Sequence, residues 1–239
     1  MAAAIIQDAR HNNLKAISLD DTGIKEVPSE LLDLAGLLRL NLAHNKLSDL
    51  PDEIDKLKHL EIMSAYANRI ATLPRSITHL QSLRRLVLSN NAIRELPAGF
   101  GTLASLEYLD LSCNKITVIS ANFGYLTTLR TLHLADNLLT ALPKEMGNLA
   151  ILETLVLRDN KLAALPAEFA QLKALAHLNL QGNQFAKLPD CLLELPLDRR
   201  EARLLLAGNP FETETKAVLK HGGVPRLFQA MREPTWGAH

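Results

Sequence analysis

One feature constrains the fold of this chain more than any other: a pattern of leucines, one asparagine and one proline returns every 23 residues. Residues 152–166 read LETLVLRDNKLAALP, and residues 129–143 read LRTLHLADNLLTALP. The first leucine of the pattern stands at Leu14, Leu37, Leu60, Leu83, Leu106, Leu129, Leu152 and Leu175, and a ninth, less regular copy spans Glu201 to Phe211. A fixed period of roughly 20–50 residues indicates a repeat architecture.

The asparagine of the pattern points to a structural role. It stands at Asn45, Asn68, Asn91, Asn114, Asn137, Asn160, Asn183 and Asn209, and Thr22 takes its place in the first copy. A buried amide there can hydrogen-bond backbone groups of its own turn and of the next repeat. An unpaired buried polar group costs about 1–3 kcal/mol. We therefore interpret the column as a structural asparagine ladder.

Each copy also predicts its own secondary structure. Alternating apolar and variable residues, as in LVL (155–157), are typical of a short strand with leucines on one side. The leucine–proline pair that follows predicts the start of a short helical or 3₁₀ turn, with Ser120 in place of proline in one copy. Apolar pairs three apart, such as Phe123 with Leu126, would pack inward from that turn.

These elements predict one curved α/β solenoid. About nine parallel strands would line its concave side, short helical or 3₁₀ segments its convex side, and helical caps its ends. We expect a single domain over 1–239, with an N-terminal cap at 1–13, repeats at 14–211 and a C-terminal cap at 212–239, broken at GGVP (222–225). The stretch DRREAR (198–203) lengthens the last repeat and reads as the transition to the cap.

Composition excludes several classes of function. The chain has 26 basic and 26 acidic residues and no basic stripe, which argues against a nucleic-acid partner. The first thirteen residues are too short and too polar for membrane insertion. Only two cysteines are present, Cys113, expected to be half-buried, and Cys191, and this favours a reducing, cytoplasmic setting over a disulfide-capped secreted one. We expect the chain alone to be a monomer.

A partner is expected on the variable strand positions, which carry no packing duty. The candidate protein-binding residues are Arg39, Ile62, Tyr66, Arg85, Tyr108, Asp110, His133, Asp136, Arg158 and Asp159. Neighbouring strands lie about 4.8 Å apart, so five of them, from Tyr66 to His133, are expected to form one contiguous patch. Tyrosine and arginine often anchor interfaces. The alternative is an ordinary solvated surface, with Asp136, Arg158 and Asp159 paired among themselves.

Catalytic and metal sites are disfavoured. Asp110 and His133 could meet beside Ser112 or Cys113, but a hydrolase of that type also needs an oxyanion hole and a pocket. Regular parallel strands without a glycine-rich loop supply neither. His44, His133 and His177 lie in different repeats and make no tetrahedral set. We therefore expect no enzymatic activity, no metal and no cofactor.

The stretch NFGYLTTLRTLHLADNLLTALPKEMGNLAILETLVLRDNKLAALPAEFAQLKALAHLNLQGNQFAKLP (122–189) resembles the intracellular Ras-group leucine-rich repeat proteins, and the last repeat ends similarly in GNPF (208–211). The resemblance implies a leucine-rich repeat solenoid that serves as a non-catalytic scaffold or adaptor. Its implied partner is a LIM-domain adaptor at cell–matrix adhesions or a Ras-pathway protein. The alternative is a constitutive structural or regulatory subunit of a phosphatase, ciliary or organellar complex.

Overall fold

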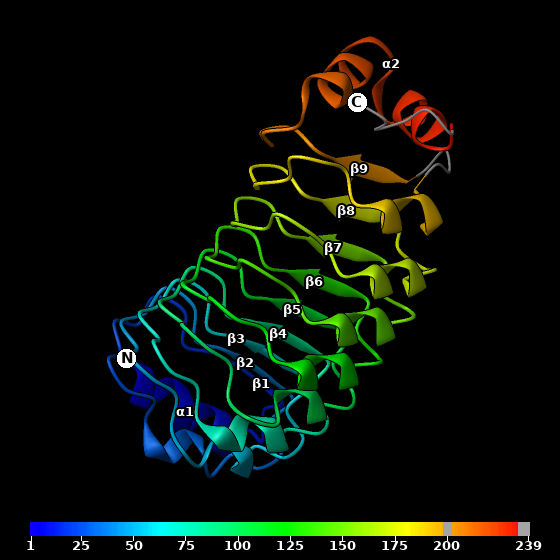
Figure 1. Cartoon of the computed structure of the whole chain (residues 1–239). Coiled ribbons are helices and arrows are strands. Elements are labelled where there is room, and N and C mark those ends of the chain that lie inside the picture. Colours follow the sequence, from blue (N-terminus) through cyan, green and yellow to red (C-terminus); the bar gives the residue numbers. More distant parts are fainter. Residues whose placement is uncertain (198–201, 234–239) are drawn as a thin grey trace.

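The computed structural model is a curved coil whose strands stack in sequence order along its length (Figure 1). It describes residues 1–197 and 202–233. One open parallel sheet runs from β1 to β9, each strand pairing with the next along the chain. The strands are Ala16–Ser18, Arg39–Asn41, Ile62–Ser64, Arg85–Val87, Tyr108–Asp110, Thr131–His133, Thr154–Val156, His177–Asn179 and Arg203–Leu205. The predicted solenoid of nine parallel strands is confirmed.

A short 3₁₀ segment follows each of the first eight strands on the convex side (Figure 1). The segments η1 to η8 are Ser29–Leu31, Ile54–Lys56, Arg75–His79, Phe100–Thr102, Ala121–Tyr125, Lys144–Asn148, Ala167–Gln171 and Asp190–Glu194. Proline precedes five of them with φ between −58° and −71°, the angle that its ring imposes. Ser120 takes the same place before η5 with φ −74°. The leucine–proline prediction is therefore confirmed.

The core fills the space between the sheet and the 3₁₀ segments. The middle residue of each strand points inward, and Leu86, Leu109 and Leu155 are fully buried. From the opposite side, Phe123 and Leu126 are buried as their spacing predicts. The first leucine of the repeat is fully buried in seven copies, but Leu14 is 42% exposed. Leu14 belongs to the first copy, whose outer side packs against helix α1 instead of another repeat.

Helices cover both ends of the coil (Figure 1). Helix α1 (Ala2–His11) buries Ile6 and Ala9 against the first repeat, as its amphipathic pattern predicts. Helix α2 (Thr213–Met231) is interrupted at Gly223, whose φ of 63° and ψ of −163° are not helical, and it buries Leu227 and Phe228. The break predicted at 222–225 is thus confirmed. Most of the predicted transition at 198–203 lies outside the described residues.

The asparagine side chains tie each repeat to its neighbour. In repeat seven, Asn160 Nδ2 donates to the carbonyl oxygens of Leu157 and Arg158 at 3.0 and 3.3 Å, within its own turn. It also donates to the Leu134 oxygen at 2.8 Å, and its Oδ1 accepts from the Leu139 N–H at 3.0 Å. Leu134 and Leu139 belong to the preceding repeat. The sequence interpretation placed this bond on the next repeat, which was the wrong direction.

The residue before each ladder asparagine has a left-handed backbone. Among non-glycine residues, φ is 54° at Ala67 and 55° at Cys113, and glycine occupies the same place at Gly182 with φ 63°. A side chain in this region costs about 1–2 kcal/mol, whereas glycine adopts it freely. The repeat turn therefore demands an unfavourable angle at a position that glycine fills in only part of the chain.

We expect Ala67→Gly to raise the free energy of unfolding by about 1 kcal/mol, because the methyl group is strained and glycine is not. Equilibrium urea unfolding measures the change. The reverse substitution at the equivalent position is Gly182→Ala. The backbone of Gly182 has a φ of 63°, and the added Cβ would lie 2.0 Å from Asp159 Oδ1, so this variant should be less stable. Equal effects of the two substitutions would contradict the assignment of strain to this turn.

Candidate functional site

The concave face presents the first and last residue of each three-residue strand. Arg39, Ile62, Arg85 and Tyr108 begin their strands, and these side chains are half-buried or exposed while the residue after each is buried. Asp110 and His133 are last residues and are half-buried. Side chains alternate across a strand, so first and last residues share one side of the sheet. Six of the ten candidate residues therefore lie on the concave side.

The other four candidates lie beyond the strands. Tyr66 and Arg158 each stand two residues after their strand ends. Asp136 and Asp159 occupy the left-handed position before the ladder asparagine, each with φ 53°. These residues line the turns that form one rim of the concave face.

Three concave residues form a cluster that we call the central cluster: Arg85, Tyr108 and His133. The Arg85 guanidinium carbon lies 3.6 Å from the centre of the Tyr108 ring, a cation–π contact of about 0.5–1 kcal/mol at an exposed site. The His133 ring lies edge-on to Tyr108, with centres 5.5 Å apart. Three successive strands, β4 to β6, position these side chains in register.

The Tyr108 phenol is held in its neutral form. Burial raises its pKa above the usual value, and the nearby Asp110 carboxylate raises it further, while Arg85 opposes the change. A neutral phenol can both donate and accept a hydrogen bond. The central cluster therefore offers a flat apolar ring, a hydroxyl group and a cation within one small area.

Tyr66 stands apart from the central cluster. Its ring packs edge-on against His44, with centres 5.1 Å apart, and His44 Nδ1 lies 2.9 Å from an Asp20 oxygen. Ile62 pairs with Arg85 across the sheet, and Tyr66 follows Ile62 by four residues, about 13 Å along the strand direction. Tyr66 therefore lies at the rim, two residues or about 7 Å beyond the column of Asp110 and His133. That the five residues form one contiguous patch stays a prediction.

Asp110 is engaged within the fold. Its Oδ1 accepts the Ser112 N–H at 2.9 Å, and its Oδ2 accepts the Ser89 hydroxyl at 3.0 Å. The same two-residue turn recurs at Asn41, whose Oδ1 accepts the Ala43 N–H at 3.0 Å. Asp110 thus shapes the turn that ends β5 rather than presenting a free carboxylate.

The rim holds ion pairs among Asp136, Arg158 and Asp159, as in the alternative of an ordinary solvated surface. Arg158 bonds Asp136 at 3.0 Å and Asp159 at 2.9 Å, and all three side chains are close to half exposed. Hydrogen bonding to Asp136 raises the pKa of Arg158, and both carboxylates add to the effect. Exposed pairs of this kind contribute about 0–1 kcal/mol each. Each carboxylate of this trio has a partner, although one arginine shared by two aspartates leaves the group with a net negative charge.

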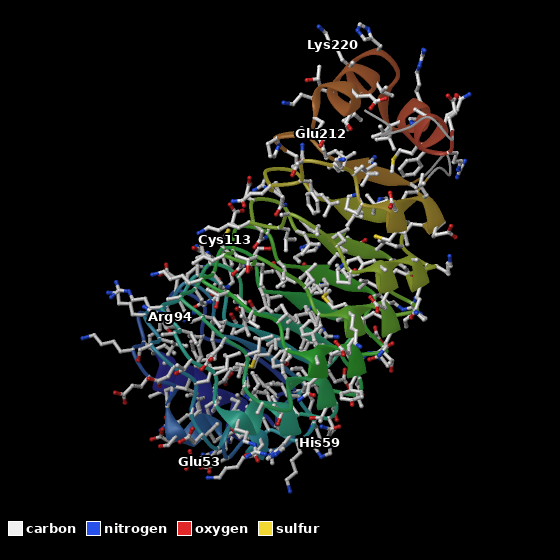
Figure 2. The ribbon with its side chains drawn as sticks, viewed as in Figure 1. Glu53, His59, Arg94, Cys113, Glu212 and Lys220 are labelled. Atoms are coloured by element: carbon white, nitrogen blue, oxygen red, sulfur yellow. The ribbon has the colours of Figure 1, made fainter. Side chains whose placement is uncertain are left out.

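The two cysteines differ in environment. Cys113 is exposed at the rim, where Figure 2 shows it on the same side as Arg94, so the expectation of a half-buried thiol was wrong. The left-handed turn carries its side chain outward. Burial, Asp136 and Asp110 still raise its pKa, so the thiol is not activated. Cys191 is buried in η8, and burial raises its pKa to about 11.

Sequence reasoning missed a hollow at the C-terminal part of the concave face. It has a volume of about 790 Å³ and its lining includes Val156, His177, Asn179, Arg203 and Leu205, from β7 to β9. The repeat pattern in the sequence already placed these residues on or beside strands. Their shared hollow was not visible there, because it depends on how side chains of three neighbouring strands are placed in space.

Metal binding and membrane insertion can be examined within the described ranges. Residues 1–197 and 202–233 contain no group of three or more histidine, cysteine or acidic side chains able to hold a metal ion. In the same part of the chain, every helix is too short or too polar to cross a bilayer.

Comparison with known proteins identifies the family. A family model described as a leucine-rich repeat region matches residues 31–135 and 112–196. The chain belongs to the leucine-rich repeat family. Proteins of this family generally mediate protein–protein interactions, and the fold is typically non-catalytic. No curated protein matches this leucine-rich repeat chain closely enough to add a specific activity.

Solved structures of leucine-rich repeat proteins share the fold. A leucine-rich repeat protein of Leptospira interrogans is 32% identical with a TM-score of 0.71, over 92% of this chain and 61% of that chain. The ectodomain of the Arabidopsis thaliana receptor kinase GASSHO1/SCHENGEN3, in complex with Casparian strip integrity factor 2, is 27% identical with a TM-score of 0.69, over 78% and 23%. The plant peptide hormone receptor RGFR1, in complex with RGF2, is 25% identical with a TM-score of 0.67, over 86% and 38%. The chain therefore spans less than two thirds of each of these structures.

Proposed function

We infer that this leucine-rich repeat protein is a non-catalytic scaffold that binds a protein partner on its concave face, with the central cluster at the middle of the contact. The observation that carries this proposal is the stack of Arg85 on Tyr108 beside His133, on a face otherwise free of packing duty. Tyrosine and arginine are over-represented among residues that dominate interface energies. Two structurally similar receptors hold peptide or protein partners, which supports the same use of the fold here.

Arg39 and Ile62 extend the proposed contact toward the N-terminus. Arg39 is exposed on β2, and it pairs in register with the half-buried Ile62 on β3. Ile62 in turn pairs with Arg85 of the central cluster. A partner seated on the cluster would therefore meet an aliphatic and a cationic side chain on the two preceding strands.

The finer proposal concerns the kind of partner. Within the Ras-group family, the repeats over 122–189 resemble those of Ras suppressor protein. That resemblance supports a cytoplasmic adaptor whose partner is a LIM-domain adaptor or another Ras-pathway protein. The alternative is a constitutive subunit of a larger assembly, in which the flanks or caps carry much of the contact.

A capture experiment from native lysate tests the concave face. We expect the Tyr66→Ala, Arg85→Ala, Tyr108→Ala triple variant to lose the partners that wild-type protein retains, as identified by mass spectrometry. The melting temperature should change little, because Arg85 and Tyr66 are exposed and Tyr108 is only half-buried. Recovery of a LIM-domain adaptor or a Ras-pathway protein by wild type alone would support the family proposal.

Control variants separate the two hypotheses. Arg94→Ala removes an arginine at the rim of repeat four and should leave the captured set unchanged (Figure 2). An unchanged set for the triple variant as well would move the contact to the flanks or caps and favour the constitutive subunit. A constitutive subunit should also keep its partners in stoichiometric amounts through high salt.

A further inference from the structure

The hollow over β7 to β9 lies in the same concave face as the central cluster, but at its C-terminal end. Its apolar part comes from Val156 and from Leu205, whose side chain is 43% exposed. Both are last residues of their strands, a position that polar residues hold in most repeats and that valine also holds at Val87. A volume of about 790 Å³ falls within the range of roughly 300–1,000 Å³ that ligand-binding pockets occupy.

A guanidinium and an imidazole stand beside this apolar surface. His177 and Arg203 are register partners on β8 and β9, so their side chains project next to each other on the concave side. Both are exposed. Within the described residues, neither side chain has a carboxylate partner. Arg203 therefore gives the hollow a positive charge, and neither side chain has a hydrogen-bond acceptor among residues 1–197 and 202–233.

The acidic groups of the neighbouring repeats are already paired. Glu153 is bonded to Arg130 of the preceding repeat, in an exposed ion pair. Asp136 and Asp159 both bond Arg158 at the rim. These three carboxylates, all within the described residues, have arginine partners of their own and none bonds Arg203.

Asn179 adds a directed donor at the centre of the hollow. Its Oδ1 accepts the Gln181 N–H at 3.0 Å, which fixes the orientation of the amide because only the oxygen can accept that bond. The Nδ2 group consequently points away from its own turn. In repeat two, the equivalent Asn41 Nδ2 bonds Ser18 at 3.3 Å, but the residue one repeat before Asn179 is Val156, which offers no acceptor.

We propose that this hollow binds an extended acidic segment of the protein partner, in which a side-chain carboxylate lies next to an aliphatic side chain. The carboxylate would bond Arg203 and His177, the Asn179 amide would donate to the backbone of the segment, and the aliphatic group would cover Leu205 and Val156. This proposal rests on the proposed concave-face function and specifies its partner. From β7 to β9 the hollow spans about 10 Å, which roughly three extended residues cover.

Selection of random peptides displayed on phage, with the full chain as bait, tests the proposal. Enriched peptides would be synthesised with acetylated and amidated ends, so that only side chains can supply a carboxylate. We expect enrichment of aspartate or glutamate beside leucine, isoleucine or valine. Fluorescence anisotropy should show affinity falling about tenfold or more for Arg203→Glu, because a cation facing the carboxylate becomes an anion. Replacing the acidic residue of the peptide by its amide should cause a similar loss.

Two further variants make the outcomes distinct. Arg94→Glu changes the net charge equally outside the hollow and should leave the affinity unchanged (Figure 2). Arg85→Glu changes the central cluster. Peptides lost with Arg85→Glu but kept with Arg203→Glu would overturn the proposal for the hollow and leave the concave-face function standing. Peptides that still bind both variants would overturn both proposals. Enrichment of basic peptides, or of no peptides, would overturn only the proposal for the hollow. Circular dichroism of each variant confirms that it is folded.

Discussion

Replacing Asn160 by alanine is expected to lower the free energy of unfolding by about 3 kcal/mol. The substitution orphans the Leu139 N–H and removes the donor that three carbonyl oxygens share. A lost hydrogen bond costs about 1 kcal/mol, and a buried group left unsatisfied costs about 1–3 kcal/mol. Asn160 is buried, so water cannot replace these bonds without opening the turn. Two-state urea unfolding of both proteins measures the difference.

The convex side offers a matched control for this substitution. Asn148 is exposed at the end of η6, and Asn148→Ala should change stability by no more than about 0.5 kcal/mol. A similar small change for Asn160→Ala would mean that solvent satisfies the turn, and the ladder would then contribute little to joining the repeats. A loss near 3 kcal/mol should lower the melting temperature by about 10 °C for a chain of this size.

Much of the fold follows from spacing alone. A 23-residue period fixes the order and parallel direction of the strands, because each repeat can bury its leucines only against its neighbours. The same period predicts which residues share a column, and Arg85 with Tyr108 is a contact of that kind. Column membership does not show which side chains touch across the rim, so the grouping of Tyr66 with the central cluster stays a prediction.

Features of the turns were harder to predict. The sequence shows asparagine at each turn, but two hydrogen-bonding directions are equally consistent with a periodic column, and the structure has the preceding repeat. Cys113 follows a strand, where a half-buried side chain is the plain expectation, yet a left-handed backbone turns it outward. The sequence also does not show which carboxylates are hydrogen-bonded within the fold. Asp110 looks available to a partner in the sequence, but its oxygens accept bonds from Ser89 and Ser112.

Glycines on the convex side are the clearest feature that the repeat pattern did not reveal. A Cβ placed on Gly101 would lie 1.8 Å from the Asn122 carbonyl oxygen and 2.8 Å from its carbonyl carbon. Gly124 is similarly close to the Glu145 backbone, one repeat later. The 3₁₀ segments of these central repeats therefore approach each other more closely than any side chain at these positions would allow. The close approach is a property of neighbouring backbones, so a single repeat does not disclose it.

Gly101→Ala is consequently expected to destabilise the protein by about 3 kcal/mol, at the upper end of overpacking effects, because backbone atoms of η5 must move away. The φ of Gly101 is not left-handed, so the cost is steric. Gly36→Ala is the matched control: its added Cβ would meet only Lys15 Nζ, the far end of a flexible side chain. That variant should be neutral or slightly stabilising, since alanine reduces the freedom of the unfolded chain. Urea unfolding that shows equal changes for both glycines would mean that the convex segments separate freely, and the close stacking would not hold the coil together.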